Sequence, residues 1–407
     1  MSATPPAVQP EPTGTTLLAA PADVRAETEA APHPMLATPV RHRSNGLVFA
    51  VIGIIIASLA LLLVAVLFLA WLGPGVTLVG AILALVPLTV VMIGVRWIDR
   101  WEPEPRGLLF FGFLWGAGMA VAVALLVGLS LDDAVGQAAA QSGVYDFFSS
   151  VVFAPIVEET AKGLGILLIF LFARRAFDGP VDGIVYAAII AGGFAFTENI
   201  EYFALEFSDP AGSVPEIFFI RGILSPFAHV MFTSMTGLFI GLAAQRGGRL
   251  LGVGGFFLGL IPAVALHAFW NGALYFVGDF YLYYVVVQVP LFALAVLLVV
   301  RLRRREVLIT QLRLSEYAAA GWFNPGELQS LATPTGRRLA RAWAKSHGLG
   351  RLMSSYIADA THLAFARERI VRGRDRVGAQ SDEALLLTQV TASRRALAAE
   401  IAKTVPQ

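Results

Sequence analysis

Eight apolar segments, each near the length of a membrane-spanning helix, constrain the fold of this chain more than any other feature. They lie at about 47–72, 76–96, 107–130, 149–173, 181–204, 219–244, 250–277 and 281–300. A helix needs about 20 apolar residues to cross a bilayer, and a lone span in lipid satisfies its backbone hydrogen bonds only as a helix. Because 57% of residues are hydrophobic and only 14% are charged, we predict an all-α polytopic membrane protein, a bundle of about eight transmembrane helices.

The charge and composition of the chain divide it into three regions. Residues 1–45 are rich in Pro, Ala and Thr, without apolar periodicity or a signal-peptide core, so we predict a disordered cytoplasmic tail. Residues 46–300 form the transmembrane domain. Residues 301–407 show amphipathic helical patterning and hold 18 Lys and Arg against 9 Asp and Glu, a net charge of +9. We predict a basic helical cytoplasmic region on the anionic inner leaflet, and no nucleic-acid partner because no such motif is present.

The positive residues predict the orientation of the bundle in the membrane. Every second connection carries arginine: Arg41 and Arg43; Arg96, Arg100 and Arg106; Arg174 and Arg175; Arg246 and Arg249; Arg301, Arg303, Arg304 and Arg305. The intervening connections, at 73–75, 131–148, 205–218 and 278–280, contain no Lys or Arg. Since positive residues stay cytoplasmic, we expect a multi-pass protein of the cell (inner) membrane with both termini in the cytoplasm.

Ionisable side chains within four of the predicted spans indicate a functional site. They are Glu158, Glu159 and Lys162 in the fourth span, Glu198 in the fifth, His229 in the sixth and His267 in the seventh. Helical rise places most of them about 15 Å from the external end of their span, and Glu198 about 9 Å. Charged residues at this depth are costly and usually functional, so we predict that the four helices share one polar site.

The spacing within this set suggests individual roles. Glu158 and Lys162 are one helical turn apart, and Glu159 is three residues from Lys162. A buried ion pair accounts for one carboxylate only. We therefore expect Glu158 or Glu159 to activate water, with Lys162 orienting the pair. Pairing of Glu158 with Lys162 one turn on would leave Glu159 as the general base. Arg221, just inside the sixth span, is interpreted as an interfacial anchor whose side chain extends outward, with contact to the substrate as the alternative.

Several peptidase chemistries are excluded by the sequence. The chain has no cysteine, no His-Glu-x-x-His and no Gly-x-Ser-x-Gly. Glutamate, histidine and asparagine supply a base and donors for a tetrahedral oxyanion. His229, His267 and Glu159 also match a zinc set of two histidines and a glutamate with one open position. A metal-dependent and a glutamate-only mechanism both remain open.

These motifs, in this order, resemble those of the PrsW-type intramembrane proteases, which are similar to the type II CAAX prenyl endopeptidases. The resemblance covers roughly 90–300 and rests on the following residues: Glu158-Glu159-x-x-Lys162, Phe194 to Glu198, His229, His267 and Asn271. The loop Asp99–Pro105 also looks like an acidic, proline-containing loop of that family. The family's His-x-x-x-Asp pattern is not kept, because Asn271 stands four residues after His267 and Thr233 four residues after His229. The resemblance implies cleavage of single-span proteins, of which an anti-sigma factor is the best-known family example.

We therefore predict an intramembrane endopeptidase whose substrate is a membrane protein. The predicted catalytic residues are Glu158, Glu159, Lys162, Glu198, His229, His267 and Asn271, with zinc as the candidate metal. Two alternatives remain: a proton-coupled membrane transporter, in which buried Glu, Lys and His relay protons, and a non-catalytic membrane anchor for residues 301–407.

Overall fold

The computed structural model describes residues 45–136, 142–374 and 376–404. The predicted disordered tail thus lies outside the described residues, except for Asn45, where the first helix begins. The described residues form helices and turns, without a strand. They divide into two compact units, one containing Arg41–Leu308 with Phe365–Ala379, the other Ile309–Ala364 with Gln380–Gln407.

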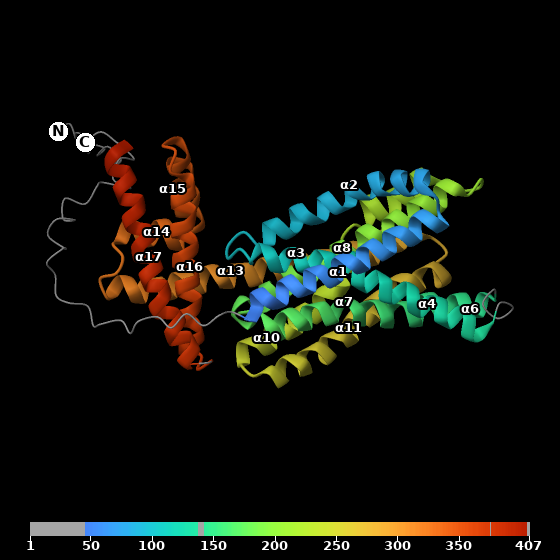
Figure 1. Ribbon diagram of the computed structural model, residues 1–407, viewed down its shortest axis with the longest axis horizontal. Coiled ribbons are helices and arrows are strands. Elements are labelled where there is room, and N and C mark those ends of the chain that lie inside the picture. The colour runs from blue at the N-terminus through green and yellow to red at the C-terminus, as the bar shows by residue number, and fades with distance from the viewer. Residues whose placement is uncertain (1–44, 137–141, 375, 405–407) are drawn as a thin grey trace, which may run out of the picture. The chain divides into compact units, whose positions relative to one another are not determined.

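The first unit is a bundle of long helices (Figure 1). In chain order its elements are α1 (Asn45–Trp71), α2 (Pro74–Ile98), α3 (Arg106–Leu114), the π-helical η2 (Trp115–Ala120), α4 (Val121–Val135), α6 (Gly143–Phe148), the π-helical η3 (Ser149–Phe153), α7 (Ala154–Phe172), the short 3₁₀ turn η4 (Arg174–Ala176), α8 (Pro180–Ser208), α9 (Val214–Phe218), the π-helical η5 (Phe219–Leu224), α10 (Ala228–Arg246), α11 (Arg249–Phe276), α12 (Phe280–Tyr283), the π-helical η6 (Tyr284–Gln288) and the part of α13 (Val289–Ala319) that precedes Ile309. The predicted boundary at residue 300 falls inside α13, which is continuous.

Seven helices among the described residues are long and apolar enough to cross a membrane. They correspond to seven of the eight predicted spans. The remaining one, 149–173, forms η3 and α7, and its 19-residue helix carries three ionisable side chains. Composition alone therefore leaves α7 outside the set, although it packs against α4, α8, α10 and α11.

Helix α8 occupies the centre of the bundle and is buried along most of its length. It packs against α2, α3, α7 and α10. Its crossing with α10 depends on two glycines, because a Cβ on Gly183 would come within 2.0 Å of the Gly237 carbonyl oxygen. Small residues allow such close approach between membrane helices. The glycine contact thus sets the separation between α8 and α10.

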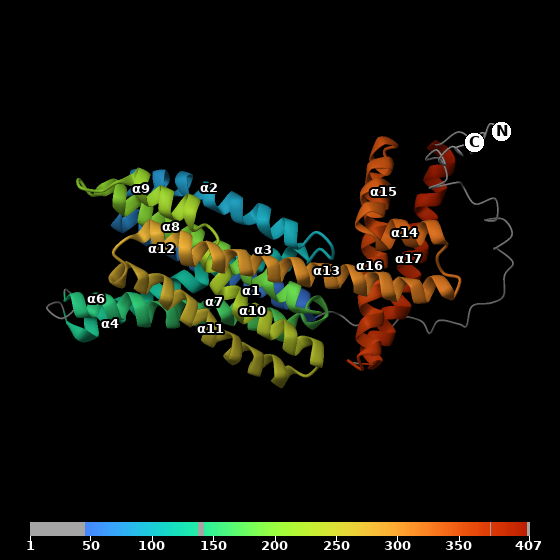
Figure 2. The ribbon, with the colours of Figure 1, turned by 180° about the vertical axis from the view of Figure 1, so that it is seen from behind.

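Two further contacts fix α7 and α11 in the bundle. The Trp115 indole N–H of η2 donates to the Ala161 carbonyl of α7 at 2.9 Å, and a Cβ on Gly165 would clash with the same indole. Helix α11 lies beside α10 (Figure 2). As a result, α7, α8, α10 and α11 meet around one interior region.

The second unit is helical and has its own apolar core. Its elements include α14 (Pro325–Ala332), α15 (Pro334–Ser346), most of α16 (Gly350–Val371) and most of α17 (Arg376–Thr404). Leu331, Tyr356 and Leu363 are among its buried residues. The Arg337 side chain is also buried, where it donates to the Leu331 carbonyl and to Thr361 Oγ1, each at 2.6 Å.

Candidate functional site

Helices α7, α8, α10 and α11 bring the predicted ionisable residues into one connected network. Lys162 Nζ lies 3.3 Å from His229 Nδ1, His229 Nε2 lies 2.8 Å from Glu198 Oε2, and His267 Nδ1 lies 3.0 Å from Glu159 Oε1. Residues separated by more than a hundred positions in the chain therefore share one site at hydrogen-bonding distance.

Glu159 is completely buried and has donors on three sides. Its carboxylate lies 2.6 Å from Lys162 Nζ, accepts from Thr233 Oγ1 at 2.7 Å and contacts His267 Nδ1. The expected pairing is therefore reversed, because Lys162 lies closer to Glu159 than to Glu158, at 3.5 Å. The i, i+3 and i, i+4 spacings are both compatible with a helical ion pair, so only the neighbouring helices could decide between them.

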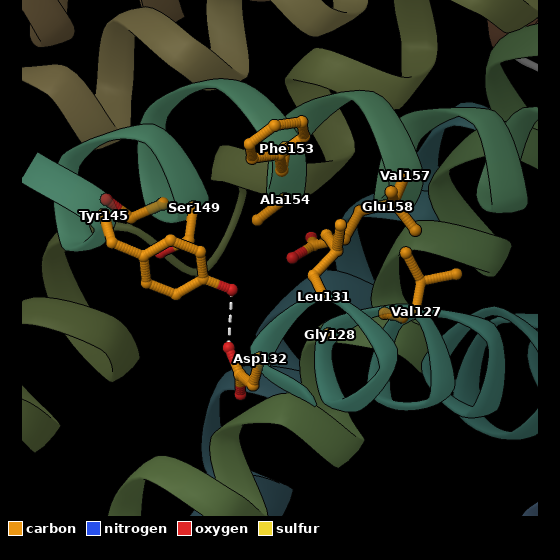
Figure 3. Close-up of a pocket in the computed structure, with 12 residues that line it drawn as sticks. Val127, Gly128, Leu131, Asp132, Tyr145, Ser149, Phe153, Ala154, Val157 and Glu158 are labelled. Atoms are coloured by element: carbon orange, nitrogen blue, oxygen red, sulfur yellow. Dashed lines mark hydrogen bonds between the residues drawn. The ribbon is translucent and has the colours of Figure 1, made fainter. Parts of the chain in front are cut away.

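Glu158 is the member of the carboxylate pair that reaches open space. Its side chain is 12% exposed whereas that of Glu159 is 0% exposed. Its Oε2 lies 3.9 Å from His267 Nε2. Figure 3 shows Glu158 pointing into a cavity of about 290 Å³ between α4 and the segment formed by α6, η3 and α7. At the other end of this cavity the Tyr145 hydroxyl donates to Asp132 at 2.6 Å.

Lys162 supplies the positive charge at the centre of the network. Its side chain is fully buried, and its Nζ lies 4.2 Å from the centre of the Phe194 ring. An ammonium group can only donate hydrogen bonds, so the contact with His229 requires Nδ1 of that ring to accept. A neutral His229 then carries its proton on Nε2 and donates it to Glu198. Both ring nitrogens of His229 are therefore held by the protein.

Arg221 belongs to this network, and its interpretation as an outward-pointing anchor is wrong. Its guanidinium pairs with Glu198, donates from Nε to Asn199 Oδ1 at 2.7 Å and lies 3.9 Å from the Tyr202 ring centre. The sequence carried a signal for this role, since Arg221 is an arginine near the end of the bundle where the connections have no Lys or Arg. Thr233 was also missed as a site residue, although its position one helical turn after His229 was a signal.

His267 and Asn271 occupy successive turns of α11. A carboxylate only accepts hydrogen bonds, so the contact with Glu159 places the His267 proton on Nδ1 and leaves Nε2 directed at Glu158. Asn271 donates from Nδ2 to the Ser150 carbonyl at 2.8 Å. It thereby ties α11 to η3, a π-helical turn beside the cavity. Such turns are frequent at functional sites.

The donor set fits a divalent metal in type and spacing. One ligand atom from each of Glu158, His229 and His267 lies within 4.8 Å of the others. Glu158 thus takes the place in this set that we predicted for Glu159. Glu159 orients His267 from behind, as carboxylates commonly do for metal-bound histidines. Because Lys162 Nζ is within 3.5 Å of Glu158 and His229, an ion bound by all three residues would require the ammonium group to move.

The acidic loop Asp99–Pro105 lies outside this network. The Glu104 backbone N–H donates to Asp99 Oδ1 at 2.9 Å, and the Tyr186 hydroxyl donates to Glu104 at 2.5 Å. Burial raises the pKa of Asp99 to about 6 and raises the pKa of Glu104 well above its usual value. This loop is therefore a buried acidic feature at the arginine-rich end of the bundle.

Comparison with known proteins identifies relatives of this chain. Residues 104–295 match the model of a family described as "PrsW family intramembrane metalloprotease". The chain is 31% identical over 186 residues to Protease PrsW of Clostridioides difficile (strain 630), covering 46% of this chain and 75% of that protein. It is 29% identical to Protease PrsW of Geobacillus kaustophilus (strain HTA426), over 36% of this chain and 58% of the relative. It is 28% identical to Protease PrsW of Bacillus subtilis (strain 168), over 36% of this chain and 60% of that protein. No solved structure gives a significant match.

Proposed function

The chain belongs to the PrsW family of intramembrane proteases, and from this membership we propose that Glu158 activates water to hydrolyse a peptide bond in or near the transmembrane segment of a membrane protein. The observation that carries the proposal is the position of Glu158 at the cavity between α4 and α7. The transporter and anchor alternatives are set aside because the matched relatives are proteases.

In this proposal the buried residues position those that face the cavity. A general base must hold water within hydrogen-bonding reach of the scissile carbonyl, and Glu158 is partly exposed at the cavity for this purpose. Glu159, Lys162 and Thr233 brace α7 against α10, and Glu159 holds the His267 ring. His267 Nε2, left without a proton, can then accept from a donor beside Glu158, while Asn271 keeps η3 in place.

Glu198 and Arg221 hold the His229 ring in position, as Glu159 holds that of His267. Arg221 fixes the Glu198 carboxylate, which in turn fixes His229 Nε2. The Nδ1 atom of His229 faces the centre of the site. This second brace joins α8 and η5 to α10, so that the two histidines approach Glu158 from different helices.

Glu158, His229 and His267 would hold the metal that the family description implies, and we propose zinc because two histidines and a glutamate form a common catalytic zinc set. Zinc, when bound, polarises a carbonyl oxygen and lowers the pKa of water. Glu158 would then offer one carboxylate oxygen to the ion and keep the other for the proton of the water, Lys162 would have to move away from Glu158 and His229, and Glu159 would orient His267.

We further propose how substrate and membrane are arranged around the protein. The substrate segment enters sideways between α4 and α7, since these helices line the cavity that contains Glu158. The protein lies in the cell (inner) membrane with both termini in the cytoplasm. Residues 301–407, with a net charge of +9, rest on the anionic inner leaflet, where each Lys or Arg contributes about 1 kcal/mol of attraction.

The test uses the full chain reconstituted in liposomes with fluorescein-labelled casein and with a labelled single-span protein. Glu158→Gln should reduce cleavage of either probe by at least about a hundredfold, the range expected on loss of a general base. Glu201→Gln, on α8 near the network, is the matched control and should cleave as wild type does. A Glu158→Gln protein with wild-type activity removes the proposed base.

Chelation tests the requirement for a metal separately from the role of Glu158. Treatment with 1,10-phenanthroline should abolish cleavage, and zinc should restore it. Full activity in the chelator would exclude the proposed zinc while leaving the role of Glu158 intact.

A further inference from the structure

A second hollow in the bundle lies among α2, α8, α10 and α13, away from the cavity that contains Glu158. Its volume is about 160 Å³. Apolar side chains make up nearly all of its wall, and those that matter here are Gly94, Trp97, Ala188, Met231, Val296 and Val299. Hollows of about this size with apolar walls accept apolar guests. Within membrane-spanning helices, the available apolar guest is a lipid acyl chain.

One end of this hollow coincides with the arginine-rich end of the bundle. Val299 lines the hollow and Arg303 follows it by one turn of α13, so both residues are on the same helix face. The Arg303 guanidinium carbon lies 4.3 Å from the centre of the Trp97 ring, and Trp97 also lines the hollow. A cation and an indole ring therefore meet where an acyl chain in the hollow would join its headgroup.

Arg303 has unused hydrogen-bonding capacity. Its Nε atom is buried and has no hydrogen-bond partner among the described residues. A buried donor without a partner costs about 1–3 kcal/mol, which a bound anion would recover. The carboxylate one turn along, Glu306, attracts the Arg303 guanidinium and also lies close to Glu102 and Asp182, but no bond from it reaches the Nε atom of Arg303. Tryptophan is typical of the membrane–water interface, and basic pockets between membrane helices on the cytoplasmic side bind anionic headgroups.

We propose that this hollow is a binding site for one anionic phospholipid, with an acyl chain between α2 and α13 and the headgroup phosphate on Arg303. The phospholipid stabilises the contact of α13 with α2, α8 and α10. It lies on the face of α10 that carries Met231, two residues from both His229 and Thr233, and is separate from the substrate cavity. The proposal does not depend on which residue is the catalytic base.

The test measures Trp97 fluorescence in the reconstituted full chain. Phosphatidylglycerol or phosphatidylcholine with brominated acyl chains serves as the quencher at equal mole fraction, and the Trp97→Phe protein isolates the Trp97 signal from that of the other six tryptophans. We expect phosphatidylglycerol to quench Trp97 at a mole fraction about fivefold lower than phosphatidylcholine requires, as one arginine–headgroup contact predicts.

Three variants discriminate the proposal from general surface attraction. Arg303→Gln should abolish the preference for phosphatidylglycerol. Arg304→Gln, an equal change of charge at an exposed neighbour, should retain it. Val296→Phe, which fills the hollow, should also abolish the preference, and circular dichroism confirms that each variant remains folded.

Three results would overturn the proposal. They are equal quenching by the two lipids, equal effects of Arg303→Gln and Arg304→Gln, and displacement of the brominated lipid by a single-span peptide. The last of these would identify the hollow as a peptide site.

Discussion

Adjacent carboxylates on α7 have different environments, and this difference determines what each can do. Glu159 is enclosed by Lys162, Thr233 and His267, whereas Glu158 borders a cavity. A carboxylate with three donors has little freedom to move toward a substrate. At the residue scale, Glu159 is therefore suited to holding the site together, and Glu158 to reacting in it.

Glu159→Gln should destabilise the protein more than Glu158→Gln does. The glutamine leaves the fully buried Lys162 ammonium without its partner at 2.6 Å, and breaking such a buried pair costs about 3–5 kcal/mol. Glu158 lies farther from Lys162 and is partly exposed, so its loss should cost less. Unfolding of the purified variants in detergent measures the difference. Adding Lys162→Met to Glu159→Gln should recover part of the lost stability, and the opposite ranking of the two single variants would contradict the assigned pairing.

Asp99→Asn should stabilise the protein at neutral pH. Burial raises the pKa of Asp99 from 3.8 to about 6 in the folded protein, so the folded state binds the proton more tightly than the unfolded state. The contribution of Asp99 to stability is thus greatest at low pH and is lost as pH rises through about 6. We expect Asp99→Asn to raise the free energy of unfolding by about 1 kcal/mol at pH 7, less than the full shift implies because solvent screens the group. The two proteins should approach equal stability below pH 3.8, the pKa of Asp99 in the unfolded state, and a constant difference across this range would argue against the pKa shift.

At the element scale, the site depends on how closely α8 and α10 approach. Helix α8 carries Glu198 and α10 carries His229, and the contact between these side chains is 2.8 Å. The two helices touch backbone to backbone at Gly183 and Gly237. Packing at these glycines therefore controls the distance between Glu198 and His229.

Gly237→Ala should reduce both stability and activity. Its methyl group would lie 2.1 Å from the Gly183 carbonyl oxygen, and because this neighbour is backbone, the helices must separate. Overpacking of this kind costs about 1–3 kcal/mol. Gly254→Ala on α11 is the matched control, since its methyl group meets nothing within 4 Å. The control should be neutral or stabilised by up to about 1 kcal/mol from helix propensity, and comparable losses in both variants would refute the role of the crossing.

At the scale of the whole molecule, arginine is concentrated in alternate connections of the bundle. The chain has no cysteine, so a single introduced cysteine reports its own side of the membrane. The orientation proposed from the arginines is therefore directly testable.

Ala211→Cys should react with a membrane-impermeant maleimide in intact spheroplasts, and Ser315→Cys only after permeabilisation. Ala211 is exposed in the connection between α8 and α9, and Ser315 is exposed on α13. The first connection has no Lys or Arg, which predicts an external location. Labelling of Ser315→Cys in intact cells would reverse the proposed topology.

The sequence by itself determined the helical membrane class, seven of the spans and most of the residues in the polar network. Apolar length and helical rise are local properties, so they can be counted along the chain. The family membership also followed from the order of the motifs along the chain. The polarity of α7 is equally local, and it explains why this segment differs from the other predicted spans.

Only the tertiary structure decided which side chains touch. Helical spacing allowed Lys162 to pair with either glutamate, and the choice of Glu159 depends on Thr233 of α10 and His267 of α11. Arg221 turned inward because Glu198 and Asn199 of α8 face it. These outcomes follow from the packing of separate helices, with α8 and α10 in contact at Gly183 and Gly237, and spacing along one helix carries no information about its neighbours.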